Sequence, residues 1–195
     1  MRGDYALFFG LWLQKPLQIA AVAPSSKRLA QVMAEMVDLD RPGPVLELGA
    51  GTGGITRGLL QAGCPCERLI TLEREPQLAA ALQRSFPGIA TIVGDATALG
   101  DHFARLGIDQ LCAVVSSLPI KWFSVEDQRA IVEPALARLG PGGAFLQMTN
   151  AFVSPIATGP LGIAGERVAH VWRNLPPSQV WAYSALADAG ARETL

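Results

Sequence analysis

A short apolar run meets three closely spaced glycines in the segment Val45-Leu46-Glu47-Leu48-Gly49-Ala50-Gly51-Thr52-Gly53. The run has the length and composition of a buried strand. The glycines allow the chain to turn sharply and to approach a ligand without an obstructing Cβ atom. A strand that turns through glycines into a helix is a typical first unit of a parallel α/β sheet. We therefore expect a ligand to bind where this strand ends.

Strands and helices continue to alternate downstream of this segment. After a first strand at 44–48, apolar strands are expected at 68–73, 89–93, 111–116 and 144–149, with helices from the glycines to about 62, at 76–86 and at 125–139. Two helices, at 3–15 and 26–38, precede the first strand, and Ser25 or Ser26 is the expected N-cap of the second. This pattern predicts a doubly wound α/β sheet.

The end of the chain departs from this alternation. Residues 150–166 are expected to be mainly loop, and two strand-like runs follow at 167–173 and 179–184. The connection between these runs is too short for a helical crossover, so they are expected to form an antiparallel hairpin. A Rossmann-like, mostly parallel sheet that ends in such a hairpin is typical of class I methyltransferases. A dinucleotide dehydrogenase would instead continue with strand–helix units.

Composition limits the partners of the protein. The chain has 195 residues, which fits a single domain, and its formal net charge of −1 does not favour nucleic acid. Three cysteines without framework spacing (Cys64, Cys66 and Cys112) fit a reducing compartment, and two histidines predict no metal site. No run approaches the roughly 20 apolar residues of a membrane-spanning helix. We therefore expect a cytoplasmic protein, and a monomer.

Three acids stand at consecutive strand ends. The glycines alone are ambiguous, because with Gly54 their spacing also satisfies the dinucleotide pattern G-x-G-x-x-G. Glu47 suits the ammonium of a methionine moiety, Glu73 the two ribose hydroxyls and Asp95 the adenine amino group. One such acid is more often a solvated loop carboxylate, but three together favour S-adenosylmethionine, with S-adenosylhomocysteine as the product. The other candidate cofactor-binding residues are Ser25, Ser26, Gly49, Gly51, Thr52, Gly53, Arg74, Ala96 and Ser116.

The fourth expected strand ends in Ser116-Ser117-Leu118-Pro119. This turn resembles the Asn/Asp-Leu/Pro-Pro-aromatic motif of methyltransferases that act on primary or exocyclic nitrogens, with serine in place of the first residue and Ile120 in place of the aromatic one. A turn at this place lies beside the transferable methyl group, so all four residues are catalytic candidates. Trp122 and Phe123 follow, and they either supply the missing aromatic surface or pack inward.

The N-terminal segment 1–40 carries a second pattern. Tyr5, Phe8, Phe9 and Trp12 recur at helical spacing, with basic residues nearby. An aromatic helix face with basic neighbours is typical of a helix in a membrane interface, and packing against the sheet is the alternative. We expect 1–40 to be a lid or membrane-contact segment and 41–195 to be the catalytic core.

Several stretches together indicate a family. The more specific ones are the Ser116–Pro119 turn and Arg173-Asn174-Leu175-Pro176-Pro177, and the others lie at 8–12, 15–16, 23–26, 45–53 and 180–183. On these stretches, which span nearly the whole chain, it resembles the bacterial phospholipid N-methyltransferases, which convert phosphatidylethanolamine stepwise to phosphatidylcholine. The resemblance implies S-adenosylmethionine as cofactor, phosphatidylethanolamine as substrate and peripheral attachment to the inner face of the cell membrane.

An amine substrate determines what the site must do. An alkyl ammonium group titrates near ~10, so it must lose a proton before it can attack the sulfonium methyl group. His170 is only a weak candidate base, so catalysis is expected to be mainly alignment in a desolvated pocket. Aromatic rings are expected to receive the methylated ammonium group, and Arg173 is either a partner of the lipid phosphate or a solvated charge. The candidate substrate-binding residues are Tyr5, Trp12, Trp122, Phe123 and Arg173.

Two other functions remain open. An rRNA adenine N6-dimethylase would carry an aromatic residue after the proline, a basic surface and an additional helical domain, which this sequence does not show. A non-catalytic, membrane-associated binding protein would keep the fold, but it would not need all three acids at the strand ends.

Overall fold

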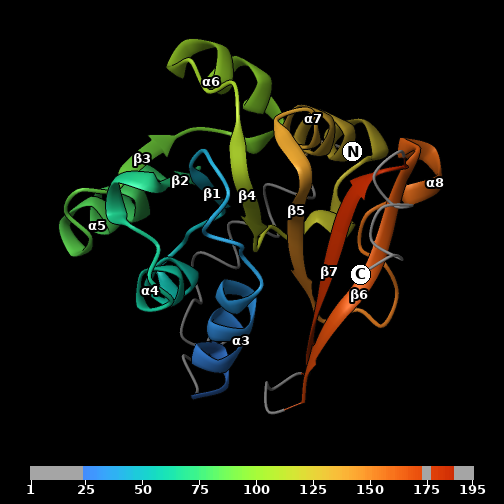
Figure 1. The fold of residues 1–195 in the computed structure, drawn as a ribbon, viewed down its shortest axis with the longest axis horizontal. Helices are drawn as coiled ribbons and strands as arrows, with labels where there is room; N and C mark the ends of the chain where they lie inside the picture. Colours follow the sequence, from blue (N-terminus) through green and yellow to red (C-terminus); the bar gives the residue numbers. More distant parts are fainter. Residues whose placement is uncertain (1–23, 173–176, 187–195) are drawn as a thin grey trace.

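The computed structural model describes residues 24–172 and 177–186, which form one seven-stranded sheet covered by helices (Figure 1). The strand order is β3-β2-β1-β4-β5-β7-β6. The first five strands are parallel, and β7 pairs antiparallel with both β5 and β6. The strands are β1 (Val45–Leu48), β2 (Leu69–Glu73), β3 (Ala90–Val93), β4 (Leu111–Ser116), β5 (Leu139–Thr149), β6 (Ile163–Val171) and β7 (Ser178–Ala185). The predicted α/β sheet with a terminal antiparallel hairpin is therefore confirmed.

Helices cover both faces of the sheet, and side chains from alternate strand positions meet them. Leu46 and Leu48 of β1 join the core beneath α6 and α7, whereas Val45 faces the core beneath α3 and α4. Figure 1 shows these two layers on opposite sides of the sheet. The α-helices are α3 (Pro24–Glu35), α4 (Gly54–Gln61), α5 (Pro76–Ser85), α6 (Leu99–Leu106), α7 (Val125–Leu136) and α8 (Thr158–Leu161), with short 3-10 turns η1 (Cys66–Arg68), η2 (Ala96–Ala98) and η3 (Ile120–Trp122).

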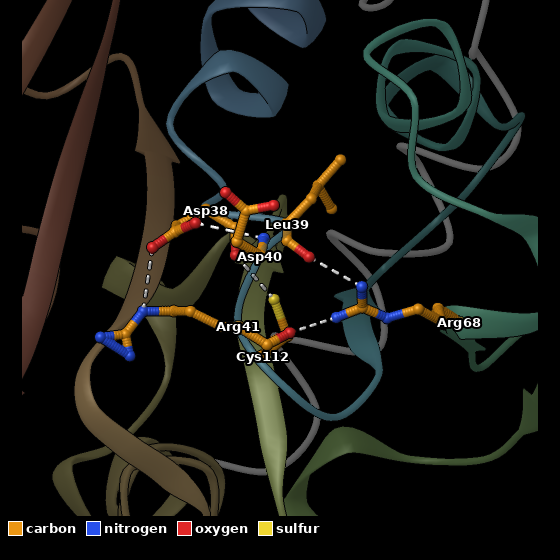
Figure 2. Close-up of polar contacts among 6 residues, drawn as sticks. All are labelled: Asp38, Leu39, Asp40, Arg41, Arg68 and Cys112. Carbon is orange, nitrogen blue, oxygen red and sulfur yellow. Dashed lines mark hydrogen bonds and ion pairs between the residues drawn. The ribbon is translucent and has the colours of Figure 1, made fainter.

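Arg68 fastens the connection between α3 and β1. Its guanidinium group donates to the backbone carbonyls of Leu39 (2.7 Å) and Arg41 (Figure 2). It also donates to the backbone carbonyl of Gly43 (2.9 Å). The Cys112 thiol donates to the Asp38 carbonyl from the adjacent strand β4 (3.2 Å). Charged donors to backbone carbonyls form strong hydrogen bonds, so this loop holds the start of β1 in place.

Several expected boundaries were wrong. Helix α3 begins at Pro24, so Ser25 and Ser26 lie inside its first turn and neither is the N-cap; proline is well tolerated there because its missing N–H has no helical partner. Helix α6 was missed, although Leu99 and Phe103 have helical spacing and are both buried. The region 150–166 is not all loop, because it contains α8 and the first residues of β6.

The start of β6 depends on Gly165. A Cβ atom at this position would lie 2.7 Å from Cε1 of Tyr183, so only glycine lets the tyrosine ring lie flat against the strand. Glycine normally weakens a strand, and for that reason the sequence pattern concealed this part of β6. The expected helix at 3–15 lies outside the described residues.

Candidate active site

The glycine loop connects β1 to α4 through left-handed backbone. Gly49, Gly51 and Gly53 have φ angles of 74°, 56° and 80°, which only glycine adopts without strain. Space is also limiting, since a Cβ atom at Gly49 would lie 2.8 Å from Leu118 Cδ2. The loop therefore approaches the Ser116–Pro119 turn more closely than any side chain at Gly49 would allow.

Glu47 lies inside the protein rather than at its surface. Its side chain is completely buried, and its two carboxylate oxygens accept hydrogen bonds from the Thr56 backbone N–H (3.2 Å) and hydroxyl (2.6 Å). Burial raises the pKa of this carboxyl from 4.5 to about 8, although the bonds from Thr56 oppose the shift. The residue thus holds the start of α4 to β1.

Glu73 lies at the end of β2 and shapes the glycine loop. One carboxylate oxygen accepts from the Gly51 backbone N–H (2.8 Å) and the other from the Glu75 N–H (2.9 Å). Each oxygen keeps a second lone pair, so the carboxylate can still accept from ligand hydroxyl groups. The backbone bonds fix its orientation before a ligand arrives.

A hollow of ≈ 460 Å³, which includes space open to solvent, lies over the carboxyl ends of β1, β2 and β3. Two of the three predicted acids, Glu73 and Asp95, line it, and Glu47 does not. The full lining is Gly49, Leu72, Glu73, Arg74, Gly94, Asp95, Ala96, Leu118 and Phe123.

Asp95 has a local structural role and also lines the hollow. Its Oδ1 accepts from the backbone N–H and the hydroxyl of Thr97, both at 2.9 Å, and thereby caps η2. Its Oδ2 lies 3.7 Å from Nε of Arg74, in an ion pair whose side chains are both about half exposed and which adds little stability. The Oδ2 atom therefore remains accessible from the hollow.

The Ser116–Pro119 turn is bonded to the glycine loop. The Ser117 hydroxyl donates to the Gly49 carbonyl (2.6 Å), and the Ser117 N–H donates to the Leu48 carbonyl (3.0 Å). Ser116 is fully buried, and its hydroxyl accepts from the Leu118 N–H (3.4 Å). Of the four turn residues, Leu118 lines the hollow.

The two aromatic residues after the turn have different surroundings. Phe123 is half-buried, and it both lines the hollow and packs against the core beneath α6 and α7. Trp122 is half exposed, and the Lys121 ammonium lies 4.6 Å from its ring centroid. Gly51, Thr52 and Gly53 belong to the loop but not to the lining. Tyr5, Trp12 and Arg173 lie outside the described residues, and so do the side chains of Ser25 and Ser26.

Three site residues were not predicted. Leu72 and Gly94 line the hollow, and their positions next to Glu73 and Asp95 were the available signal. Gln147 of β5 is fully buried and donates from Nε2 to the Leu118 carbonyl (2.9 Å). A polar residue in the middle of the apolar run 144–148 was its signal.

Residues 24–172 and 177–186 contain neither a membrane-spanning helix nor a cluster of metal ligands. None of the helices there is both long enough and apolar enough to cross a bilayer. No group of three or more His, Cys, Asp or Glu side chains within that part of the chain is arranged to hold a metal ion.

Known proteins match this chain to different extents. The ornithine lipid N-methyltransferase of Singulisphaera acidiphila is 36% identical over 150 residues, which cover 75% of this chain and 78% of that protein. The ribosomal RNA small subunit methyltransferase A of Sphingopyxis alaskensis is 37% identical over 94 residues, but the match covers only 47% of this chain and 33% of that protein. No protein-family model matches the chain.

The fold has solved counterparts. The O-methyltransferase from Bacillus cereus, solved in complex with SAH, superposes with a TM-score of 0.62 at 14% identity and covers 88% of each chain. At that identity the likeness concerns the fold.

Proposed function

The chain belongs to the lipid N-methyltransferase family of class I S-adenosylmethionine-dependent methyltransferases, and from this premise we propose that it methylates the amine of phosphatidylethanolamine and then of its mono- and dimethyl derivatives. The observation that carries the proposal is the hollow, because it joins the acids of two strand ends to the turn that carries the catalytic candidates. Ornithine lipid is the second candidate substrate, since the extensively matching relative is named for it.

The residues of the hollow fit S-adenosylmethionine. Glu73 accepts hydrogen bonds from the ribose hydroxyls through its free lone pairs, and Asp95 accepts from the adenine amino group. Leu72, Ala96 and Phe123 supply apolar walls for the adenine ring. When bound, the cofactor supplies a methyl group on a positively charged sulfonium. The glycine loop faces the methionine end.

The chain's own residues then position the amine. A lipid amine reacts only when neutral, and a desolvated site next to a positive charge lowers its pKa. The Ser116–Pro119 turn offers backbone and hydroxyl oxygens beside the hollow and holds them rigidly through the Ser117–Gly49 bond. Phe123 presents an aromatic face for the ammonium group that forms as methyl groups accumulate.

Membrane attachment is the second part of the proposal. The aromatic N-terminal segment with Tyr5 and Trp12 lies in the interface of the inner membrane face, and Arg173 pairs with the lipid phosphate. The domain works as a monomer that needs no metal. None of the helices in the described part of the chain could span a membrane. Attachment through the N-terminal segment would therefore bring the active site to a lipid substrate that stays in the bilayer.

One experiment separates the candidate substrates. The protein is incubated with methyl-labelled S-adenosylmethionine and vesicles of phosphatidylcholine that contain either phosphatidylethanolamine or ornithine lipid, with ribosomal RNA as a third acceptor. Labelled mono-, di- and trimethylated phosphatidylethanolamine is the expected result. Label only in ornithine lipid replaces the first substrate with the second, and label in RNA overturns the lipid assignment. Cofactor binding with no labelled acceptor supports the non-catalytic binding protein.

A further inference from the structure

Three buried polar atoms lack a hydrogen-bond partner, and all three project from one face of the outer sheet. They are Gln147 Oε1 on β5, Trp181 Nε1 on β7 and His170 Nε2 on β6. Gln147 lies directly opposite Trp181, and His170 lies opposite Gln179, two residues before Trp181. Directly opposed residues share a face, so the three side chains form one group across neighbouring strands.

The orientation of the Gln147 amide is fixed. Its Nε2 donates to two carbonyl oxygens, those of Leu118 (2.9 Å) and Met148 (2.7 Å). With the amide reversed, Oε1 would face both carbonyl oxygens and could not bond to either of them. Nε2 is therefore the atom that faces the two carbonyls. A completely buried acceptor therefore points away from the backbone toward a donor that the described residues do not provide.

The hydrogen-bonding character of these side chains changes from strand to strand with distance from the hollow. Leu118 lines the hollow and bonds to Gln147, so the acceptor is nearest to the hollow. The next strand outward supplies the Trp181 indole N–H, which can only donate. Beyond it, on β6, lie His170 and the Arg167 cation, which is also opposite Trp181. The sequence of groups is thus acceptor, donor, cation.

We propose that this face binds the zwitterionic head of the lipid substrate. Gln147 Oε1 accepts a hydrogen bond from the substrate amine and holds it beside the Ser116–Pro119 turn. Trp181 Nε1 donates to the anionic group of the head, a phosphate or a carboxylate, with Arg167 and His170 beside it. The inference rests on the proposed function, since it assigns contacts to the same lipid substrate.

Trp181 and Tyr183 provide a matched test, because both project from the same face of β7. Trp181→Phe removes an N–H that has no partner in the described structure, whereas Tyr183→Phe removes a hydroxyl bonded to Ser154 (2.8 Å). We expect Trp181→Phe to raise KM for the lipid about tenfold at an unchanged S-adenosylmethionine Kd. Tyr183→Phe should lower the melting temperature and leave the lipid KM unchanged.

A second variant tests the amine contact, and a binding measurement separates the two hypotheses. Gln147→Met should lower kcat more than it raises KM, and it should shift the pH profile of kcat for phosphatidylethanolamine micelles. Binding of glycerophosphoethanolamine and of free ornithine is measured in parallel in the presence of S-adenosylhomocysteine. Loss of this binding in Trp181→Phe supports the head-group site even if no lipid is methylated, in which case only the proposed function fails. Equal lipid KM and equal head-group affinity in wild type and Trp181→Phe would overturn the site and indicate that water alone satisfies these atoms.

Discussion

Ser117 donates its hydroxyl to the Gly49 carbonyl at 2.6 Å, which ties the turn after β4 to the loop after β1. These two strands are neighbours in the sheet, so their carboxyl ends form opposite walls of the same crevice. The bond makes the position of the Ser116–Pro119 turn depend on the position of the glycine loop. We therefore expect the alignment of the methyl donor with the amine to depend on it.

Removal of this bond should affect turnover more than stability. Ser117→Ala is expected to lower kcat about tenfold, because small misplacements in a reacting pair have large effects, and to lower the free energy of unfolding by about 1 kcal/mol. Ser124→Ala is the matched control, since it removes another serine bond, the cap to the Asp127 N–H at 3.1 Å. It should cost about 1 kcal/mol at unchanged kcat. Equal kcat values in the two variants would contradict the alignment role.

Asp95 offers a variant that separates ligand binding from local structure. Asp95→Asn keeps one oxygen, which can still cap η2 through Thr97, but places an NH₂ group toward the adenine amino group. We expect the Kd for S-adenosylmethionine, measured by calorimetry, to rise about tenfold or more at an unchanged melting temperature. The exposed Asp101→Asn is the control. An affinity equal to that of the wild type would refute the adenine contact.

Glu47 predicts an unusual pH dependence. Its pKa is raised from 4.5 to about 8 by burial, so the folded state binds a proton that the unfolded state releases between these values. The contribution of Glu47 to the free energy of unfolding must then fall as pH rises through this window, by an amount on the order of a few kcal/mol. Glu47→Gln should remove this part of the dependence and gain relative stability at alkaline pH. Urea denaturation of both proteins from about pH 5 to about pH 9 measures it. Parallel pH curves would show that the carboxyl stays ionised in the folded protein.

Arg68 should be important for stability and irrelevant to ligand binding. A lysine cannot reach the three carbonyls that its guanidinium group bonds, so Arg68→Lys is expected to lower the free energy of unfolding by about 2–4 kcal/mol. The Kd for S-adenosylmethionine should not change. Arg84→Lys on the exposed side of α5 is the control for the substitution itself. A stability loss no larger than that of the control would mean that the loop 38–43 holds without the arginine.

The sequence predicts the sheet and most of the lining of the hollow for a clear physical reason. Parallel strands have continuous apolar runs, and their carboxyl ends lie at one edge, so Glu73 and Asp95 were expected near each other and near Gly49. Glu47 was placed by the same rule, but it lies within the strand rather than after it. Its completely buried carboxylate bonds to Thr56 of α4 and does not line the hollow, and this tertiary contact is not carried by the sequence pattern.

Other features depend on contacts that the sequence pattern does not carry. Gln147 is a polar residue in a mostly apolar strand, and its importance appears only when β5 is paired with β4 and β7. Helix α6 is short and contains Gly100, which weakens its pattern. The start of β6 depends on Gly165, whose fit against Tyr183 is a tertiary contact.

The strand order has a consequence for how the protein is made. Strand β7 comes last in the chain but lies between β5 and β6, so both of these strands expose unpaired backbone until residues 178–185 have left the ribosome. The cofactor loop and β1 to β4 can assemble earlier. A nascent chain can therefore form the part of the sheet that carries the glycine loop before it completes the face that carries Gln147, Trp181 and His170. A chain truncated before Ser178 would leave the backbone of β5 and β6 unpaired and open to association with other chains.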